Sequence, residues 1–238
     1  MSRAPGLHLS GTLRFDAAAQ IAVDLNIEAG AWTCLLGPSG VGKSTLLRTI
    51  AGLPSGGTFE GQIKGLDTPR QTQVAYMAQD DGLAPWLDVL QNVTLGAKLR
   101  GERLDMPRAQ ALVAQVGLAD HARKTPSALS GGMRQRAALA RTLMEDRQIV
   151  LLDEPFSALD AKNRAEMQEL AFAALAGRTV LLVTHDPSEA VRLGHHILVM
   201  HQGTIRHSAL PPGAPLRNYN APEVLSAGAA LLAELRGP

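Results

Sequence analysis

The spacing of hydrophobic and polar positions changes along the chain, and each change predicts a different kind of element. Residues 7–35 hold short and partly alternating apolar stretches, "LHLSGTLRF", "IAVDLNI" and "WTCLLG", which are typical of strands joined by turns. The next stretch, "STLLRTIAGL", predicts a helix that ends at Gly52, and residues 56–78 predict two short strands around glycine-rich turns. The first third of the chain is therefore rich in strands.

The pattern becomes helical after Pro85, from Val89 to about Ala128 and again over residues 131–146. Strands and helices alternate from residue 148 onwards. Because the runs at 149–152 and 179–183 are continuously apolar, they predict buried parallel strands. The stretch "HHILVMHQGTIRH" predicts a hairpin, and residues 208–238 hold a proline-rich linker and one helical segment. The chain thus predicts an α/β core interrupted by a helical insert at about 82–146.

Composition narrows the class of protein without naming an activity. The 238 residues suffice for one large domain, or for a main domain with a smaller insert. The net charge of +1 gives no overall attraction to nucleic acid or anionic lipid. The N-terminus lacks the apolar core of a secretory signal, and no apolar run approaches the ~20 residues that span a bilayer, so any membrane role is expected to be peripheral. Cys34, the only cysteine, is interpreted as a small core residue.

Two motifs predict chemistry on a nucleoside triphosphate. The stretch "GPSGVGKS" at 37–44 matches G-x-x-x-x-G-K-[ST] between a predicted strand and a predicted helix. Its glycines let backbone N–H groups surround phosphates, Lys43 would reach the β and γ phosphates, and the Ser44 hydroxyl would bind Mg²⁺. The stretch "QIVLLDEP" ends an apolar strand with Asp153 and Glu154. One carboxylate there can hold the water shell of Mg²⁺, and the other can orient or deprotonate an attacking water.

A third motif, "LSGGMRQR" at 129–136, predicts another helix start. Ser130 is a candidate N-cap, and the backbone N–H groups and dipole of such a start favour an anion. The chain therefore carries two helix starts suited to phosphate, and the first motif alone already accounts for one bound triphosphate.

In their order along the chain, these motifs resemble those of the ATP-binding cassette (ABC) transporter ATPases. The resemblance also includes Gln79, "SALD" at 157–160 and "VTHD" at 183–186. It implies a P-loop NTPase core of the α/β class with a mostly parallel sheet, an N-terminal antiparallel β region and an inserted helical subdomain. It also implies one ATPase domain over residues 1–207 and a short C-terminal linker and helix over 208–238.

The same resemblance implies the ligands, ATP and Mg²⁺, and the residues that handle them. Catalytic roles fall to Glu154, His185 and Gln79, and metal binding to Ser44, Gln79 and Asp153. The loop expected to bind the phosphates of ATP consists of Gly37, Pro38, Ser39, Gly40, Val41, Gly42, Lys43, Ser44 and Thr45. Phe15 lies where the family places an aromatic residue that stacks on adenine, although a Phe that packs within a strand would fit the same position.

The resemblance further implies a dimer of two copies. Ser130, Gly131 and Gly132 would contact the ATP held by the other copy, and Asp160 would lie in the loop that passes between subunits. Two ATP molecules would then lie between two subunits related by a two-fold axis.

The resemblance implies that this chain is cytoplasmic and peripheral on the cytoplasmic face of the inner membrane. Its implied partners there are transmembrane permease subunits, contacted through about residues 79–93, "QDDGLAPWLDVLQNV". The "PW" pair is similar to cassettes of importers for nitrate, sulfonates, taurine and thiamine precursors. An importer also depends on a periplasmic or extracellular solute-binding protein. Two alternatives are an exporter cassette and an ABC ATPase acting on DNA or ribosomes, but the sequence lacks the long coiled-coil inserts, tandem cassettes and basic extensions usual in the latter.

Other residues that attract attention are given structural interpretations. His195, His196 and His201 lack a Cys or carboxylate at ligand spacing and are interpreted as packed or solvated side chains. The arginines of residues 134–141 are interpreted as surface or subunit contacts rather than as a nucleic-acid site.

Overall fold

The computed structural model describes residues 4–15, 20–66, 70–201 and 203–236. The chain divides into two compact units that are not continuous in sequence. The first unit consists of Met1–Val74, Gln148–Asp153 and Gly177–Pro238. The second consists of Ala75–Arg147 and Glu154–Ala176. The predicted limits of a domain at 1–207 and of an insert at about 82–146 stay predictions.

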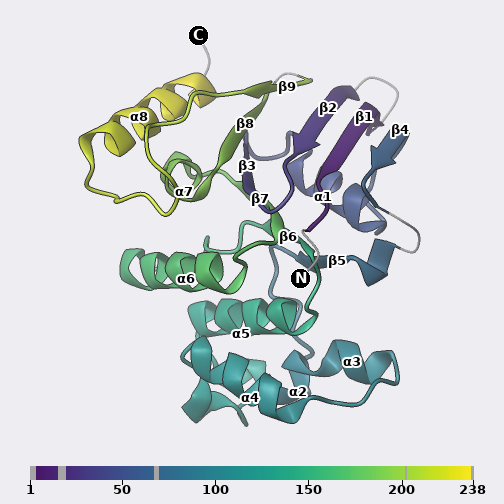
Figure 1. Cartoon of the computed structure of the whole chain (residues 1–238). Helices are drawn as coiled ribbons and strands as arrows, with labels where there is room; N and C mark the ends of the chain where they lie inside the picture. Colours follow the sequence, from purple (N-terminus) through teal and green to yellow (C-terminus); the bar gives the residue numbers. More distant parts are fainter. Residues whose placement is uncertain (1–3, 16–19, 67–69, 202, 237–238) are drawn as a thin grey trace. The chain divides into compact units, whose positions relative to one another are not determined.

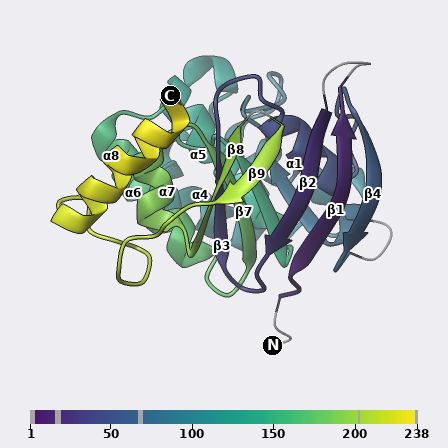
Figure 2. The same cartoon turned by 90° about the horizontal axis from the view of Figure 1, so that it is seen from above.

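The first unit contains a small antiparallel sheet, with strands side by side in the order β2-β1-β4 (Figure 2). Its strands are β1 (Leu7–Arg14), β2 (Gln20–Ile27) and β4 (Thr58–Lys64). Every second residue of β2 is buried, as expected for a strand with one face on a core. A side chain at Gly11 would place its Cβ 2.3 Å from the Glu60 carbonyl oxygen, so glycine permits the close approach of β1 to β4. The predicted antiparallel region is confirmed.

The larger sheet of the first unit has the order β6-β7-β3-β8-β9. These strands are β3 (Trp32–Leu36), β6 (Ile149–Asp153), β7 (Thr179–Thr184), β8 (His196–His201) and β9 (Thr204–His207). Neighbouring strands are parallel except β8 and β9, which form an antiparallel hairpin. Every residue of β3, β6 and β7 is buried. The continuous apolar runs therefore predicted buried parallel strands correctly.

Among its described residues, the first unit has three α-helices and one short 3-10 turn. They are α1 (Lys43–Ala51), η1 (Arg70–Thr72), α7 (Pro187–Leu193) and α8 (Pro222–Arg236). Helix α1 ends as predicted at Gly52, whose φ of 71° is the left-handed conformation that glycine adopts readily at a C-cap. Helix α8, drawn in yellow, lies beside α7 (Figure 1).

The second unit is mostly helical. It contains α2 (Val89–Val93), α3 (Leu95–Leu99), α4 (Met106–Gln115), η2 (Ala119–His121), η3 (Pro126–Ala128), α5 (Gly131–Met144) and α6 (Ala161–Ala174). Strand β5 (Val74–Met77) begins at the last residue of the first unit and continues into the second. The helical pattern predicted from Val89 onwards is interrupted at Gly101 and Gly117, which both have positive φ and separate successive helices. No helix in the described ranges is long and apolar enough to cross a membrane.

Candidate functional site

The predicted phosphate loop leaves the end of β3 and enters α1 at Lys43. Gly42 is the N-cap of α1, and its φ of 106° lies in a region that L-residues rarely adopt. A Cβ at this position would lie 2.3 Å from Cζ of Phe15, so any larger residue would also have to displace the Phe15 ring. Gly42 has no side chain with which to cap α1, so the N-cap residue leaves the amides of the first turn available for an anion.

The Lys43 side chain lies over the same loop. Only 5% of Lys43 is exposed, and its Nζ donates hydrogen bonds to the carbonyl oxygens of Gly37 at 2.7 Å and Pro38 at 2.8 Å. Hydrogen bonds from an ammonium group offset part of the cost of burying its charge. The structure therefore holds a cation against the loop that the sequence predicted for phosphates.

Two predicted metal ligands meet in the first unit although 109 positions separate them in sequence. The Ser44 hydroxyl donates to Oδ1 of Asp153 at 3.0 Å, and Asp153 is 1% exposed at the end of β6. Both groups offer oxygen, the ligand type that Mg²⁺ prefers. The described residues contain no cluster of three His, Cys, Asp or Glu side chains suited to a metal. This donor set nevertheless fits Mg²⁺, which usually takes one or two protein ligands and completes its shell with phosphates and water.

Two predicted catalytic residues meet in the second unit. Nε2 of Gln79 donates to Oε2 of Glu154 at 3.5 Å. Glu154 has a φ of 48°, an uncommon left-handed conformation for a non-glycine residue. The amide and hydroxyl of Ser157 both donate to the Glu154 carbonyl oxygen, at 3.3 and 3.0 Å, and hold this turn in place. Strained backbone of this kind is frequent at functional sites, where the surrounding structure fixes one side chain.

The "LSGG" stretch of residues 129–132 begins α5, and Ser130 is its N-cap as predicted. The Ser130 hydroxyl oxygen accepts a hydrogen bond from the Met133 amide at 3.3 Å. Gly132 packs closely, because an added Cβ would lie 3.0 Å from Cδ2 of Leu159. Ser130 itself is exposed, and Gly131 and Gly132 are half-buried. The predicted signature residues thus form an accessible helix start.

Two arginines of α5 bind the loop that follows Gln79, which the sequence did not predict. Arg134 donates from Nε to Oδ2 of Asp81 at 2.9 Å and from Nη1 to the Leu129 carbonyl oxygen at 3.1 Å. Arg141 donates to the carbonyl oxygens of Gly82 and Asp81, both at 2.7 Å. The interpretation of these arginines as surface or subunit contacts missed this link within the chain. Spacing gave no signal for it, because the partners are more than 50 positions apart.

The remaining predicted site residues lie at the ends of strands or at the starts of helices. His185 is exposed directly after β7, and Asp160 is the N-cap of α6, where it accepts from the Asn163 amide at 2.9 Å. This hydrogen bond from the backbone lowers the pKa of Asp160. Phe15 lies against Gly42, in contact with the phosphate loop, a position that suits either of the two roles considered for it.

The histidine group has partners that were not visible in the sequence. Nδ1 of His195 accepts from the Trp32 amide at 3.1 Å, and Nε2 of His196 lies 2.6 Å from Oε2 of Glu28. Burial is the main cause that lowers the pKa of His195. These contacts tie the start of β8 to neighbouring segments of the first unit.

Comparison with known proteins identifies the family. Residues 21–157, more than half of the chain, match the family model described as ABC transporter. The chain belongs to the ABC transporter family. It is an ATP-binding ATPase of that family, as the resemblance of its motifs predicted, and its α/β fold class is confirmed.

Several relatives of this ABC ATPase are similar over most of their length. An uncharacterized ABC transporter ATP-binding protein of Haemophilus influenzae is 44% identical over 90% of this chain and 91% of its own. An aliphatic sulfonates import ATP-binding protein, SsuB 1 of Rhodococcus jostii, is 48% identical over 84% of this chain and 80% of its own. The corresponding protein of Delftia acidovorans is 40% identical over 98% of this chain and 95% of its own.

A solved structure supports the same assignment. The dimeric structure of an ATP-binding cassette in a post-hydrolysis state, bound to ADP and Pi, has a TM-score of 0.74 and 30% sequence identity with this ABC ATPase. The similarity covers 89% of this chain and 99% of that one.

Proposed function

We propose that this ABC ATPase is the ATP-hydrolysing subunit of an importer, and that two copies of it enclose two ATP molecules. The names of several relatives at 40–48% identity support import, because they are aliphatic sulfonates import ATP-binding proteins. Among the solutes left open by the sequence, which are a thiamine precursor, a sulfonate and nitrate, these names favour a sulfonate. The solute itself would pass through separate membrane subunits.

The observation that carries hydrolysis is the hydrogen bond between Ser44 and Asp153, which brings two metal-binding groups beside the start of α1. Mg²⁺, held by Ser44, Asp153 and Gln79, would neutralise charge on the β and γ phosphates. Lys43 and the backbone N–H groups of the loop at 37–45, other than Pro38, bind those phosphates, and Phe15 stacks on adenine. These contacts would supply most of the rate enhancement, because phosphoryl transfer depends chiefly on positioning the reactants and on stabilising the charge of the transition state.

The remaining roles concern the attacking water and the second copy. Glu154 orients and deprotonates the water, and His185 fixes the geometry at the γ-phosphate. Ser130 and the amides of Gly131 and Gly132 bind the ATP held by the other copy. Because each copy supplies the same groups to its partner, the interface has two-fold symmetry. ATP then stabilises the closed dimer, and hydrolysis removes that stabilisation.

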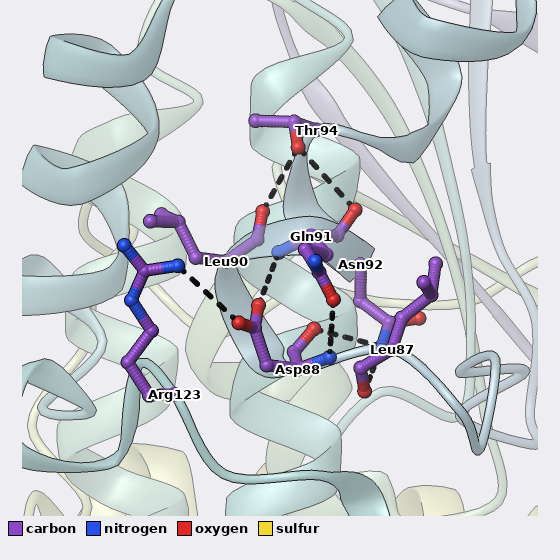
Figure 3. A network of polar contacts seen from close by, with 7 residues as sticks. All are labelled: Leu87, Asp88, Leu90, Gln91, Asn92, Thr94 and Arg123. Carbon is purple, nitrogen blue, oxygen red and sulfur yellow. Dashed lines mark hydrogen bonds and ion pairs between the residues drawn. The ribbon is translucent and has the colours of Figure 1, made fainter.

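We assign the docking surface for the permease to residues 79–93, which include an exposed tryptophan. Trp86 is 78% exposed, and tryptophan is among the residue types that contribute most binding energy at protein interfaces. A polar network holds the chain on both sides of it, and part of that network is drawn in Figure 3. Trp86 therefore stands on a loop with a defined conformation.

Asn92 and Asp88 organise that loop. The buried Asn92 donates from Nδ2 to the carbonyl oxygens of Ala84, Leu87 and Asp88, at 3.2, 3.1 and 3.0 Å, and its Oδ1 accepts from the Ala84 amide at 2.7 Å. Asp88 caps α2 by accepting from the Gln91 amide at 2.7 Å, while the Gln91 side chain accepts from the Asp88 amide (Figure 3). This is a capping box, which fixes the direction in which the chain enters the helix.

The catalytic part of the proposal is tested with Glu154→Gln. This variant keeps ATP binding but loses the carboxylate that activates water, so it should accumulate as a dimer with Mg-ATP in size-exclusion chromatography. Glu166→Gln makes the same change on the exposed surface of α6 and should elute as the unchanged protein does. A Glu154→Gln variant that stays monomeric with Mg-ATP would show that Glu154 does not have this role.

The contribution of the second copy is tested with Ser130→Arg. The bulky cation should leave binding of ATP to the monomer intact and abolish hydrolysis, because it blocks the ATP of the partner. Ser226→Arg, at an exposed position of α8, is the matched control. Unchanged turnover in Ser130→Arg would refute the role across the subunit interface.

The import assignment is tested by co-purification in detergent, from membranes of cells that express this chain, with transmembrane permease subunits. Trp86→Ala should lose co-purification while the ATPase activity of the isolated chain persists. Leu99→Ala is a matched control, because Leu99 is also 78% exposed but lies outside residues 79–93. If no membrane protein binds and DNA or ribosomes stimulate the ATPase, importer function is wrong.

A further inference from the structure

The segment between β9 and α8 folds back onto α7, the helix that follows His185. The Arg217 amide donates to the Arg192 carbonyl oxygen at 3.0 Å, and Nε of Arg192 donates to the Arg217 carbonyl oxygen at 3.3 Å. The Arg192 guanidinium also lies 4.1 Å from the centre of the Tyr219 ring, a cation–π contact. The two segments therefore hold each other through backbone and side chains.

The side chain of Arg217 reaches the C-terminal end of α7. Only 7% of Arg217 is exposed, and its Nη1 donates to the carbonyl oxygens of Val191 and Gly194, both at 2.8 Å. Carbonyls at a helix C-terminus lack partners within the helix, and a cation is favoured there. Burial lowers the pKa of the Arg217 guanidinium, so its charge is kept inside at a cost in desolvation. Arg217 therefore ties the C-terminal end of α7 to the segment that follows β9.

The other end of α7 fixes the backbone on both sides of His185. The Thr184 hydroxyl donates to Oε2 of Glu189 at 2.6 Å and accepts from the Asp186 amide at 3.0 Å. The Asp186 side chain accepts from the Ser188 amide at 2.9 Å and caps the helix. Any shift of α7 is therefore passed to His185, which lies between these two anchored residues.

Helix α7 depends on such anchors because it is short. It has seven residues, well below the length at which a helix is stable by itself. A cleft of about 490 Å³, lined among others by His185, Tyr219, Leu225 and Leu232, separates the His185 end of α7 from α8. Helix α8 packs along α7 elsewhere, and the side-chain hydrogen bonds to the carbonyl oxygens of Val191 and Gly194 at the C-terminal end of α7 come from Arg217.

We propose that Arg217 is a positioning residue for ATP hydrolysis, which fixes α7 so that His185 is held at the γ-phosphate. This inference rests on the role assigned to His185 in the proposed function. It makes the segment that carries Arg217, between β9 and α8, part of the hydrolytic machinery rather than only a linker.

The direct test is hydrogen exchange of the full chain, which does not require activity. Arg217→Met removes both hydrogen bonds but keeps an unbranched side chain, and the amides of α7 should exchange at least about tenfold faster, the effect of losing a charged hydrogen bond. Amides of α1 should not change. Arg206→Met, at an exposed position of β9, is the matched control and should leave α7 unchanged. Because both bonds come from Nη1 alone, Arg217→Lys should restore much of the protection, and it carries the test if Arg217→Met does not fold.

The second measurement asks whether Arg217 acts through His185. Arg217→Met should lower kcat about tenfold with little change in the KM for ATP, as expected when an interaction of the transition state is lost. In a His185→Ala background, Arg217→Met should add no further loss of kcat, whereas a purely structural effect would add. Unchanged exchange in α7, or full additivity, overturns the proposal. If His185→Ala alone retains full activity while Arg217→Met accelerates hydrogen exchange in α7, the role assigned to His185 is wrong, but Arg217 still stabilises α7.

Discussion

The conformation of the loop that carries Trp86 depends on the buried side-chain amide of Asn92. The variant Asn92→Asp tests this dependence, because it replaces only the NH₂ group of that amide with an oxygen. The replacement keeps the size and shape of the side chain. It also keeps an oxygen that can accept from the Ala84 amide. The NH₂ group, however, becomes a second oxygen, and this group faces three carbonyl oxygens at 3.0–3.2 Å. The two hydrogens of an amide NH₂ make at most two good bonds among these three acceptors.

The expected loss follows from those two bonds. Each is worth about 1 kcal/mol, and leaving buried carbonyl groups facing a carboxylate adds a desolvation penalty, so the free energy of unfolding should fall by about 3 kcal/mol at pH 7. The introduced carboxyl group should have a raised pKa in the folded protein, because only its protonated form can donate to a carbonyl. The destabilisation is therefore full well above that pKa and shrinks as the pH falls toward the unfolded value of about 3.9.

Urea denaturation monitored by circular dichroism at several pH values measures this loss. Acrylamide quenching and the emission of tryptophan report the loop itself, because Trp32 is 2% exposed and Trp86 is 78% exposed. Asn220→Asp, at an exposed position, makes the same chemical change and should alter stability by less than about 0.5 kcal/mol. If Asn92→Asp is as stable as Asn220→Asp from pH 5 to 8, the amide does not organise the loop as argued.

Three further predictions concern other parts of the chain. Gly228 lies inside α8 and an added Cβ would meet no atom within 4 Å, so Gly228→Ala should raise the free energy of unfolding by about 0.5–1 kcal/mol in urea titrations. Burial raises the pKa of the Cys34 thiol, so the thiol stays protonated at pH 8, and the folded protein should react with a thiol reagent only as fast as it unfolds; rapid labelling would contradict this. Arg141→Met removes two hydrogen bonds to the carbonyls of Asp81 and Gly82 and should cost about 2–3 kcal/mol. Exchange of amides 79–83 should then rise, and Arg141→Lys should recover less than half of the loss, since one nitrogen replaces two.

Most of the fold could be predicted because its signals are local. Strand burial is visible in the apolar runs at 149–152 and 179–183, and the ends of α1 and α5 are marked by Gly52 and Ser130. The phosphate loop and the carboxylates at the end of β6 are short motifs, and their residue types indicate the ligand that each motif binds. The sequence assigned Ser44 and Asp153 to the same metal ion, which places them near each other, but it did not predict the hydrogen bond that joins them.

The supporting contacts could not be predicted, because they join polar groups that are distant in sequence and belong to no motif. Arg217 and the carbonyls of α7 are more than 20 positions apart, and Arg141 and its partners are about 60 apart. A hydrophobic pattern reports which face of an element is buried, but it does not report which cation meets which carbonyl. The capping box of Asp88 and Gln91 did have a local signal, because an N-cap residue and a Gln three positions later form a recognisable pattern.

The two helix starts that suit phosphate differ in a way that bears on the proposed dimer. The start of α1 has no side-chain cap and has Lys43 beside it, so its amides and a cation are both directed to one loop. At the start of α5, Ser130 already binds the Met133 amide, and the nearest arginine, Arg134, is engaged by Asp81 and by the Leu129 carbonyl. Lys43 is also hydrogen-bonded, but to the uncharged carbonyl groups of Gly37 and Pro38, whereas the charge of Arg134 is paired with a carboxylate. With one amide used and its cation paired with Asp81, we expect the second start to bind an anion more weakly than the first. The proposed order of assembly follows from this difference: ATP binds first to residues 37–45 of one copy, and residues 130–132 of the other copy then close onto a phosphate that is already held.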